Sequence, residues 1–142
     1  MADDPADLTD EQENDEDRLE PTHLVRRSRV VLRAGILMLG AGTSGLRVRE
    51  VMAAVARSVG IQQLDAQVTF TQIVLTVGRR GLFRTQVGET RPGVNADRIA
   101  WLHRLSHDLH PHERAADIER RLDEIEQRPL CYPAWLLVLL VS

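Results

Sequence analysis

The 142-residue sequence predicts an α+β fold, in which about four helices pack on one face of a small antiparallel sheet of 2-3 strands. Apolar residues recur at helical spacing before residue 60 and again after residue 95. Between these stretches, residues 66–87 are rich in β-branched side chains and contain a glycine-rich turn. The expected order of elements is therefore α-α-β-β-β-α-α, and the length leaves room for one domain.

The first twenty residues differ from the rest of the chain in charge. They contain ten acidic side chains and one basic side chain, Arg18, and their apolar residues show no periodicity. Because like charges at this density repel one another and little apolar surface is available, residues 1–20 are predicted to be a disordered acidic tail. Residues 21–131 are expected to form the folded domain, and all of their basic side chains apart from histidine are arginines.

Two helices are predicted ahead of the sheet. Apolar or small residues within residues 24–39 repeat every three or four positions, which indicates an amphipathic helix that ends near Gly40. Either Thr43 or Ser44 can cap a second helix, because each carries a side-chain oxygen that accepts a backbone hydrogen bond. Gly60 is expected to end this second helix.

The predicted sheet follows the second helix. Residues 66–77 are mainly β-branched and partly alternate in polarity, which indicates a strand. Residues 78–81, with a glycine at each end, supply turn chemistry before a further strand over residues 82–87. Two or three antiparallel strands fit this pattern.

Two more helices are predicted after the sheet. A proline and a glycine at residues 92–93 break the chain, and Asn95 can cap a third helix that ends at Pro111. The fourth helix has an apolar side over residues 115–125. Its acidic residues precede arginines by four positions, an arrangement that stabilises exposed helices.

The carboxyl end is apolar but short. About nine residues follow Pro133, whereas a bilayer crossing needs about 20 apolar residues, so residues 132–142 are predicted to be the start of a truncated transmembrane helix. Tyr132 and Trp135 suit the membrane interface, and arginines within residues 120–128 place the domain on the cytoplasmic side. A buried final element of a soluble domain is the alternative. The acidic amino terminus does not resemble a signal peptide, and the single cysteine, Cys131, excludes an internal disulfide.

Several short segments together resemble the threonine/serine exporter family. They share their order and approximate spacing with that family from about residue 30 to the carboxyl end. The segments are residues 42–50, 68–73, 90–95, 105–106, 122–125 and 132–136.

The resemblance implies the cytoplasmic domain of an exporter of small amino acids such as threonine and serine. The domain would face the cytoplasm at the inner or cell membrane. It would be incompetent for transport without the multi-helix membrane region, which a transmembrane partner subunit could supply. A free-standing soluble regulatory or amino-acid-binding module is the alternative, and the oligomeric state, homo-oligomers included, stays open.

Six residues are candidates for binding a small amino acid: Arg47, Glu50, Thr69, Thr71, Arg91 and Asn95. Arg47 and Glu50 are three positions apart on the second predicted helix and can face the same way. Arg91 and Asn95 flank the start of the third helix, where an arginine beside a helix amino terminus suits a carboxylate. Ion pairing and helix capping explain the same four residues structurally.

The two threonines complete this candidate set. Thr69 and Thr71 would share one face of the predicted strand and could line the same pocket. Threonine is also simply a favourable strand residue, so a structural role accounts for both positions.

Two other patterns favour a structural interpretation, so the chain is expected to need no cofactor and no metal. Residues 40–45 spell G-x-G-x-x-G with Asp65 further on, but a helix rather than a strand is predicted before them, and a helix-to-helix turn needs the same glycines. His103 and His107 are one helical turn apart, yet two imidazoles leave a zinc site incomplete.

Enzymatic and nucleic-acid functions have little support in the sequence. Ser44 lacks the G-x-S-x-G setting, and Cys131 has no base nearby in the sequence. Aromatic residues make up 4% of the chain, too few for base stacking. Contact with anionic lipid explains the arginines better. The chain is therefore expected to be neither an enzyme nor a nucleic-acid-binding protein.

Overall fold

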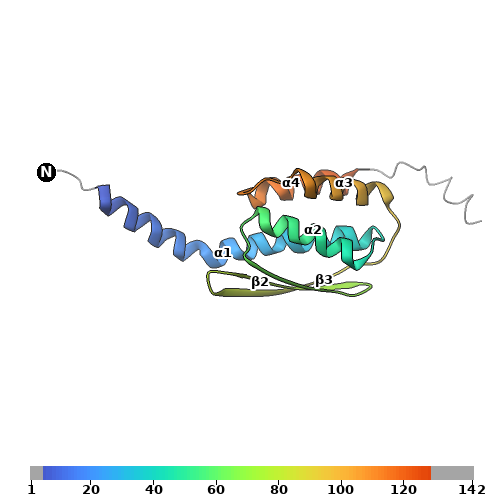
Figure 1. Ribbon diagram of the computed structural model, residues 1–142, viewed down its shortest axis with the longest axis horizontal. Helices are drawn as coiled ribbons and strands as arrows, with labels where there is room; N and C mark the ends of the chain where they lie inside the picture. The colour runs from blue at the N-terminus through green and yellow to red at the C-terminus, as the bar shows by residue number, and fades with distance from the viewer. Residues whose placement is uncertain (1–4, 129–142) are drawn as a thin grey trace, which may run out of the picture.

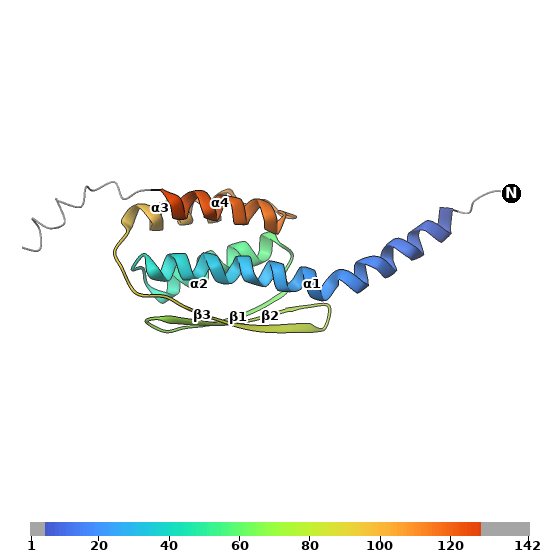
Figure 2. The same cartoon turned by 180° about the vertical axis from the view of Figure 1, so that it is seen from behind.

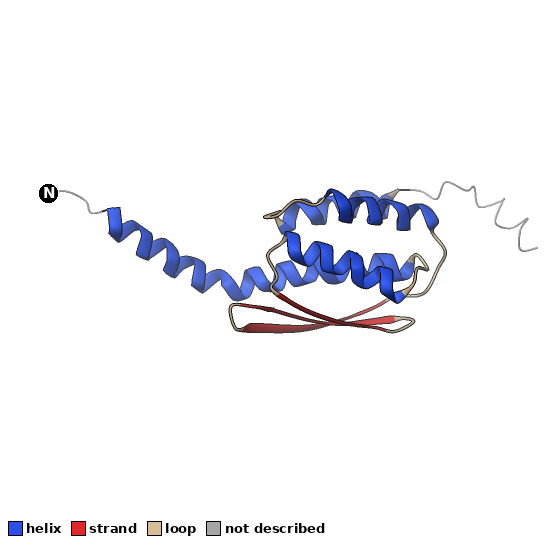
Figure 3. Cartoon of the chain, viewed as in Figure 1, coloured by secondary structure: helices blue, strands red, loops and turns tan. Residues whose placement is uncertain are grey.

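The computed structural model describes the backbone of residues 5–128 and the side chains of residues 23–128. It confirms the α+β class and the predicted order of elements (Figure 1, Figure 3). The elements are α1 (Pro5–Gly40), α2 (Gly45–Ser58), β1 (Gln63–Val68), β2 (Gln72–Arg79), β3 (Leu82–Glu89), α3 (Ala96–Asp108) and α4 (Ala115–Gln127).

The elements form three layers. The sheet is antiparallel with β2 in the centre, in the order β1-β2-β3. Helices α1 and α2 contact the sheet, while α3 and α4 pack on the far side of α1 and α2 (Figure 1, Figure 2). The two helices that precede the sheet in the chain therefore lie between the sheet and the two helices that follow it.

Helix α1 is longer than the sequence predicts. It begins at Pro5, so it includes most of the segment predicted to be a disordered acidic tail. Acidic residues in the first turns of a helix interact favourably with its dipole, and glutamate is a good helix former. This first half extends away from the three layers (Figure 1), and the core packing of α1 begins at Leu24, which is buried.

The structure corrects the first predicted strand. Residues 66–77 do not form one strand, because a turn over residues 69–71 divides them between β1 and β2. The Thr69 hydroxyl holds this turn through hydrogen bonds of 3.1 Å with both the N–H and the carbonyl of Gln72. The second turn is the predicted one, since Arg80 and Gly81 take the positive φ values of a tight hairpin.

One face of β2 forms the centre of the core between the sheet and helices α1 and α2. Its alternate residues Ile73, Leu75 and Val77 are fully buried beneath the helices. Gly35 lets α1 pack closely against α2, because a Cβ at that position would lie 2.5 Å from Met52 Sδ. A second part of the core lies between the α1–α2 layer and the α3–α4 layer. It includes Leu102, Leu105, Ile118, Leu122 and Ile125.

The opposite face of the sheet has no helix on it in the described part of the chain. On β3, the side chains of Phe83 and Val87 are 64% and 56% exposed on this face. The fold therefore has one buried and one open sheet face, as antiparallel sheets permit.

Arg33 ties α1 to α4. Its guanidinium forms salt bridges with Asp123 and with Glu126, the latter at 2.7 Å, and Nη1 donates to the Glu119 carbonyl at 3.4 Å. Burial alone would lower the pKa of Arg33, but its hydrogen bonds and charge interactions with Glu126 and Asp123 outweigh this effect and raise the pKa. Arg33 therefore stays charged and fixes the position of α4 on α1.

No helix within residues 5–128 is both long enough and apolar enough to cross a membrane. The predicted transmembrane segment, residues 132–142, lies outside the described residues.

Candidate functional site

The turn between α1 and α2 is held against the loop that leads to α3. The N–H of Gly93 donates to the Gly40 carbonyl at 2.9 Å, and the N–H of Asn95 donates to the Ala41 carbonyl at 3.0 Å. Gly42 lies between these contacts with a φ of +91°. Two segments that are far apart in the sequence, residues 40–42 and 93–95, therefore form one corner.

Two predicted caps are present at this corner. Ser44, rather than Thr43, caps α2, because its hydroxyl accepts from the N–H of Arg47 at 3.5 Å. Asn95 caps α3, since its Oδ1 accepts from the N–H of Arg98 at 2.9 Å. The side-chain oxygen of Asn95 is thus already engaged in a structural hydrogen bond.

Arg47 and Glu50 line one hollow between α2 and α3, with a cavity volume of about 730 Å³. His103 on α3 and Leu46 on α2, whose side chain is 62% exposed, line it as well. Within residues 23–128, neither Arg47 nor Glu50 forms a salt bridge. One cationic and one anionic group therefore face the same space with their charges available to a ligand.

Thr69 lines a neighbouring hollow of about 330 Å³, which shares Ser44 with the first. Phe70 and Pro92 also line this second hollow. The two hollows meet at the α2 cap, but the Thr69 hydroxyl is already used within the β1–β2 turn.

The remaining candidates lie apart from both hollows. Thr71 lies in the β1–β2 turn, so Thr69 and Thr71 do not share a strand face as predicted. The Thr71 carbonyl accepts from the N–H of Thr90 at 2.8 Å, and Arg91 is exposed next to that contact. The structure thus brings Arg47 and Glu50 together, places Thr69 nearby, and leaves Thr71 and Arg91 outside.

The chemistry of the larger hollow suits a zwitterion. A free amino acid carries a carboxylate, which a guanidinium can bind through two parallel hydrogen bonds, and an ammonium, which a carboxylate can bind. The α2 amino terminus adds N–H groups and a positive dipole end beside Arg47. The sequence did not indicate that Leu46 and His103 line this hollow. The three strands separate α2 from α3 along the chain, and no local pattern predicts that the two helices contact each other.

The two other sequence patterns have structural explanations here. Gly40 is the last residue of a helix, so residues 40–45 lack the strand that a dinucleotide-binding turn requires before its glycines. The His103 and His107 rings pack edge to face with centroids 4.3 Å apart. Among the described residues, no group of three or more His, Cys, Asp or Glu side chains could hold a metal ion.

Comparison with known proteins gives one family. Residues 29–142 match the family model ThrE, described as "Putative threonine/serine exporter". No curated protein and no solved structure matches the chain. The match covers the three-layer body from residue 29 of α1 onward and all six candidate residues.

Proposed function

The chain belongs to the threonine/serine exporter family, and on this premise we propose that it is the cytoplasmic domain of an exporter of small amino acids. In this proposal the chain alone is not competent for transport, and a membrane region supplies the path by which the amino acid crosses the membrane. The family match carries the proposal, because it extends over most of the chain and through the apolar carboxyl end to residue 142.

The charge distribution supports the proposed orientation. Arg120, Arg121 and Arg128 lie within a short stretch just before the apolar residues 132–142. Arginines that flank an apolar segment favour the cytoplasmic side of a membrane. In this proposal, residues 132–142 begin the attachment to the membrane, and α4 leads into them.

The proposed role of the Arg47–Glu50 hollow is to bind threonine or serine on the cytoplasmic side. Arg47 would bind the carboxylate and Glu50 the ammonium, while the side chain of the amino acid would face α3 at His103. A site open to solvent and built on exposed charges suits weak, reversible binding, as a sensor of cytoplasmic substrate requires.

Removal of residues 132–142 is expected to move the chain from the membrane fraction to the soluble fraction. The deletion removes the apolar residues after Pro133, whose transfer from water into lipid favours binding to the membrane. Fractionation of cells that express the untagged native chain, followed by immunoblotting, measures this change.

A pair of point variants makes the fractionation specific. Leu137→Asp introduces a charge that costs about 3 kcal/mol within a bilayer, whereas Leu46→Asp makes the same change at an exposed position of the folded domain. Only the first is expected to release the chain from membranes. If the native chain and both variants stay soluble and no membrane protein co-purifies, the free-standing regulatory module becomes the better assignment.

Threonine and serine are expected to bind the full chain with millimolar affinity, as measured by isothermal titration calorimetry. Arg47→Gln should weaken this binding about tenfold, since it removes a charge-assisted contact to the carboxylate. Arg91→Gln is the matched control, because Arg91 is an exposed arginine that lines neither hollow. Absence of heat with either amino acid, or equal weakening by both variants, would remove the binding role and leave the family assignment intact.

A further inference from the structure

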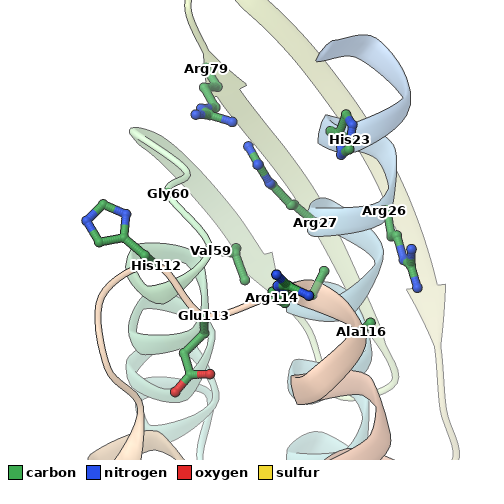
Figure 4. Close-up of a pocket in the computed structure, with 11 residues that line it drawn as sticks. His23, Arg26, Arg27, Val59, Gly60, Arg79, His112, Glu113, Arg114 and Ala116 are labelled. Carbon is green, nitrogen blue, oxygen red and sulfur yellow. The ribbon is translucent and has the colours of Figure 1, made fainter. Parts of the chain in front are cut away.

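A strongly basic cavity lies at the end of the domain where α4 begins. Its volume is about 490 Å³, and its walls come from α1, the α2–β1 connection, the end of β2 and the start of α4 (Figure 4). It shares no residue with the Arg47–Glu50 hollow. The basic residues of its lining are His23, Arg26, Arg27, Arg79, His112 and Arg114.

Two of these arginines face each other. The guanidinium groups of Arg27, on α1, and Arg79, at the end of β2, point toward one another in Figure 4 and line the same cavity. Like charges held close together repel, and the repulsion grows when the groups are partly removed from water. Such an arrangement is stabilised by an anion placed between the two groups.

Arg27 gives this cavity an unused donor. Its Nη1 atom is buried and has no hydrogen-bond partner among the residues whose side chains the structure describes. A buried charged donor without a partner costs free energy, because it has lost water and gained nothing in return. An oxyanion in the cavity would supply the missing acceptor.

The acidic side chain of the lining does not neutralise the cavity. Glu113 turns away from Arg27 and Arg79 in Figure 4, and its carboxylate accepts from the N–H of His110 at 3.3 Å. Arg26 has an acidic partner outside the lining, Glu119 at 4.0 Å, but Arg26 is exposed, Glu119 is partly exposed, and a pair at this distance near the surface is weak. Among the described residues of the lining, four arginines therefore stand against one glutamate.

The amino terminus of α4 adds to the same positive field. Arg114 occupies the N-cap position and makes no side-chain cap hydrogen bond, so the first N–H groups of α4 receive no side-chain oxygen there. Ala115 and Ala116, in the first turn, both line the cavity. Backbone N–H groups and the positive end of the helix dipole favour an anion at this point.

We propose that this cavity is a binding site for a phosphate-bearing anion. Several arginine forks around one space match the tetrahedral oxygens of a phosphate, which needs more donors than a single carboxylate does. The described residues of the lining include no aromatic ring other than the two imidazoles, so the site is expected to recognise the phosphate groups without stacking a nucleotide base. The site is separate from the amino-acid hollow and regulates the domain through a second ligand.

Pyrophosphate is expected to bind the full chain in detergent solution, as measured by calorimetry at low ionic strength. Arg27→Gln should weaken this binding about tenfold or more, because it removes charge-assisted hydrogen bonds to the phosphate. Arg114→Gln should weaken it as well. Without pyrophosphate, the thermal midpoint of Arg27→Gln should not fall, since the variant removes a buried donor atom, Arg27 Nη1, that has no hydrogen-bond partner among the described side chains.

Arg29→Gln is the control for nonspecific attraction. Arg29 lies on α1, two residues from Arg27, but it is exposed and does not line the cavity. It should change the affinity for pyrophosphate by less than about twofold. Equal weakening of pyrophosphate binding by Arg27→Gln and Arg29→Gln overturns the proposal, and so does a native chain that binds neither pyrophosphate nor vesicles that contain phosphatidic acid.

Vesicles of phosphatidylcholine with phosphatidic acid distinguish a lipid headgroup from a soluble anion. If pyrophosphate competes with the vesicles and Arg27→Gln weakens both, the site accepts phosphate from either source. If Arg27→Gln weakens binding to these vesicles alone, the anion is a lipid headgroup and the chemistry of the site stands. Vesicle binding that is insensitive to Arg27→Gln, together with no binding of pyrophosphate, contradicts the site.

Discussion

Replacement of Ile73 by alanine is expected to lower the free energy of unfolding by about 3–4 kcal/mol. Ile73 is fully buried on the central strand β2, and its Cδ1 lies 3.0 Å from the position that a Cβ on Gly35 would take. The substitution leaves a cavity where the sheet meets α1, and the close-packed surroundings can fill it only partly. Urea denaturation followed by circular dichroism measures the change as a lower midpoint.

Val74→Ala is the matched control on the same strand. Val74 points to the opposite face of the sheet, where it pairs with Gln67 on β1 and Val87 on β3. That face carries no helix in the described part of the chain, so the expected loss is below about 1 kcal/mol. A loss at Val74 equal to that at Ile73 would mean that the open face is covered in solution, and the layer arrangement would need revision.

Gly42→Ala is expected to cost about 2–4 kcal/mol, since two penalties act at one position. A φ of +91° is unfavourable for any residue with a Cβ, and the added carbon would lie 2.3 Å from the Gly93 carbonyl oxygen. That oxygen belongs to the backbone, so relief requires the α1–α2 turn to separate from the loop before α3. The same denaturation measurement applies, together with faster hydrogen exchange at the Gly93 N–H.

Gly60→Ala separates the two penalties. Gly60 has a similar φ of +77°, but a Cβ there would have nothing within 4 Å. Only the backbone penalty of about 1 kcal/mol is expected. If Gly42→Ala costs no more than Gly60→Ala, the contact between the two loops contributes nothing to stability.

The helices and their caps were predictable because their signals are local. The spacing of apolar residues indicated four helices, and Asn95 carries its capping oxygen in the sequence itself. The turn at residues 69–71 was not predictable in the same way. Thr69, Phe70 and Thr71 all favour strands, and only the hydrogen bonds between Thr69 and Gln72 show that the chain reverses there.

Sites were harder to predict than elements, since they depend on contacts between distant segments. Arg47 and Glu50 could be paired because three residues separate them on one helix. Arg27, Arg79 and Arg114 come from three different elements, and each alone resembles an ordinary surface arginine. Their convergence follows from the layer packing, which the sequence pattern does not specify.

The position of α4 has a mechanical consequence. At 13 residues, this helix is about 20 Å long, with the basic cavity at its first turn and Arg128 at its C-cap. Near the carboxyl end of α4, Asp123 and Glu126 form salt bridges with Arg33, which connect the helix to α1. Because a helix of this length moves as one rigid body, a displacement of its first turn beside the cavity is expected to displace Arg128 at its C-cap as well.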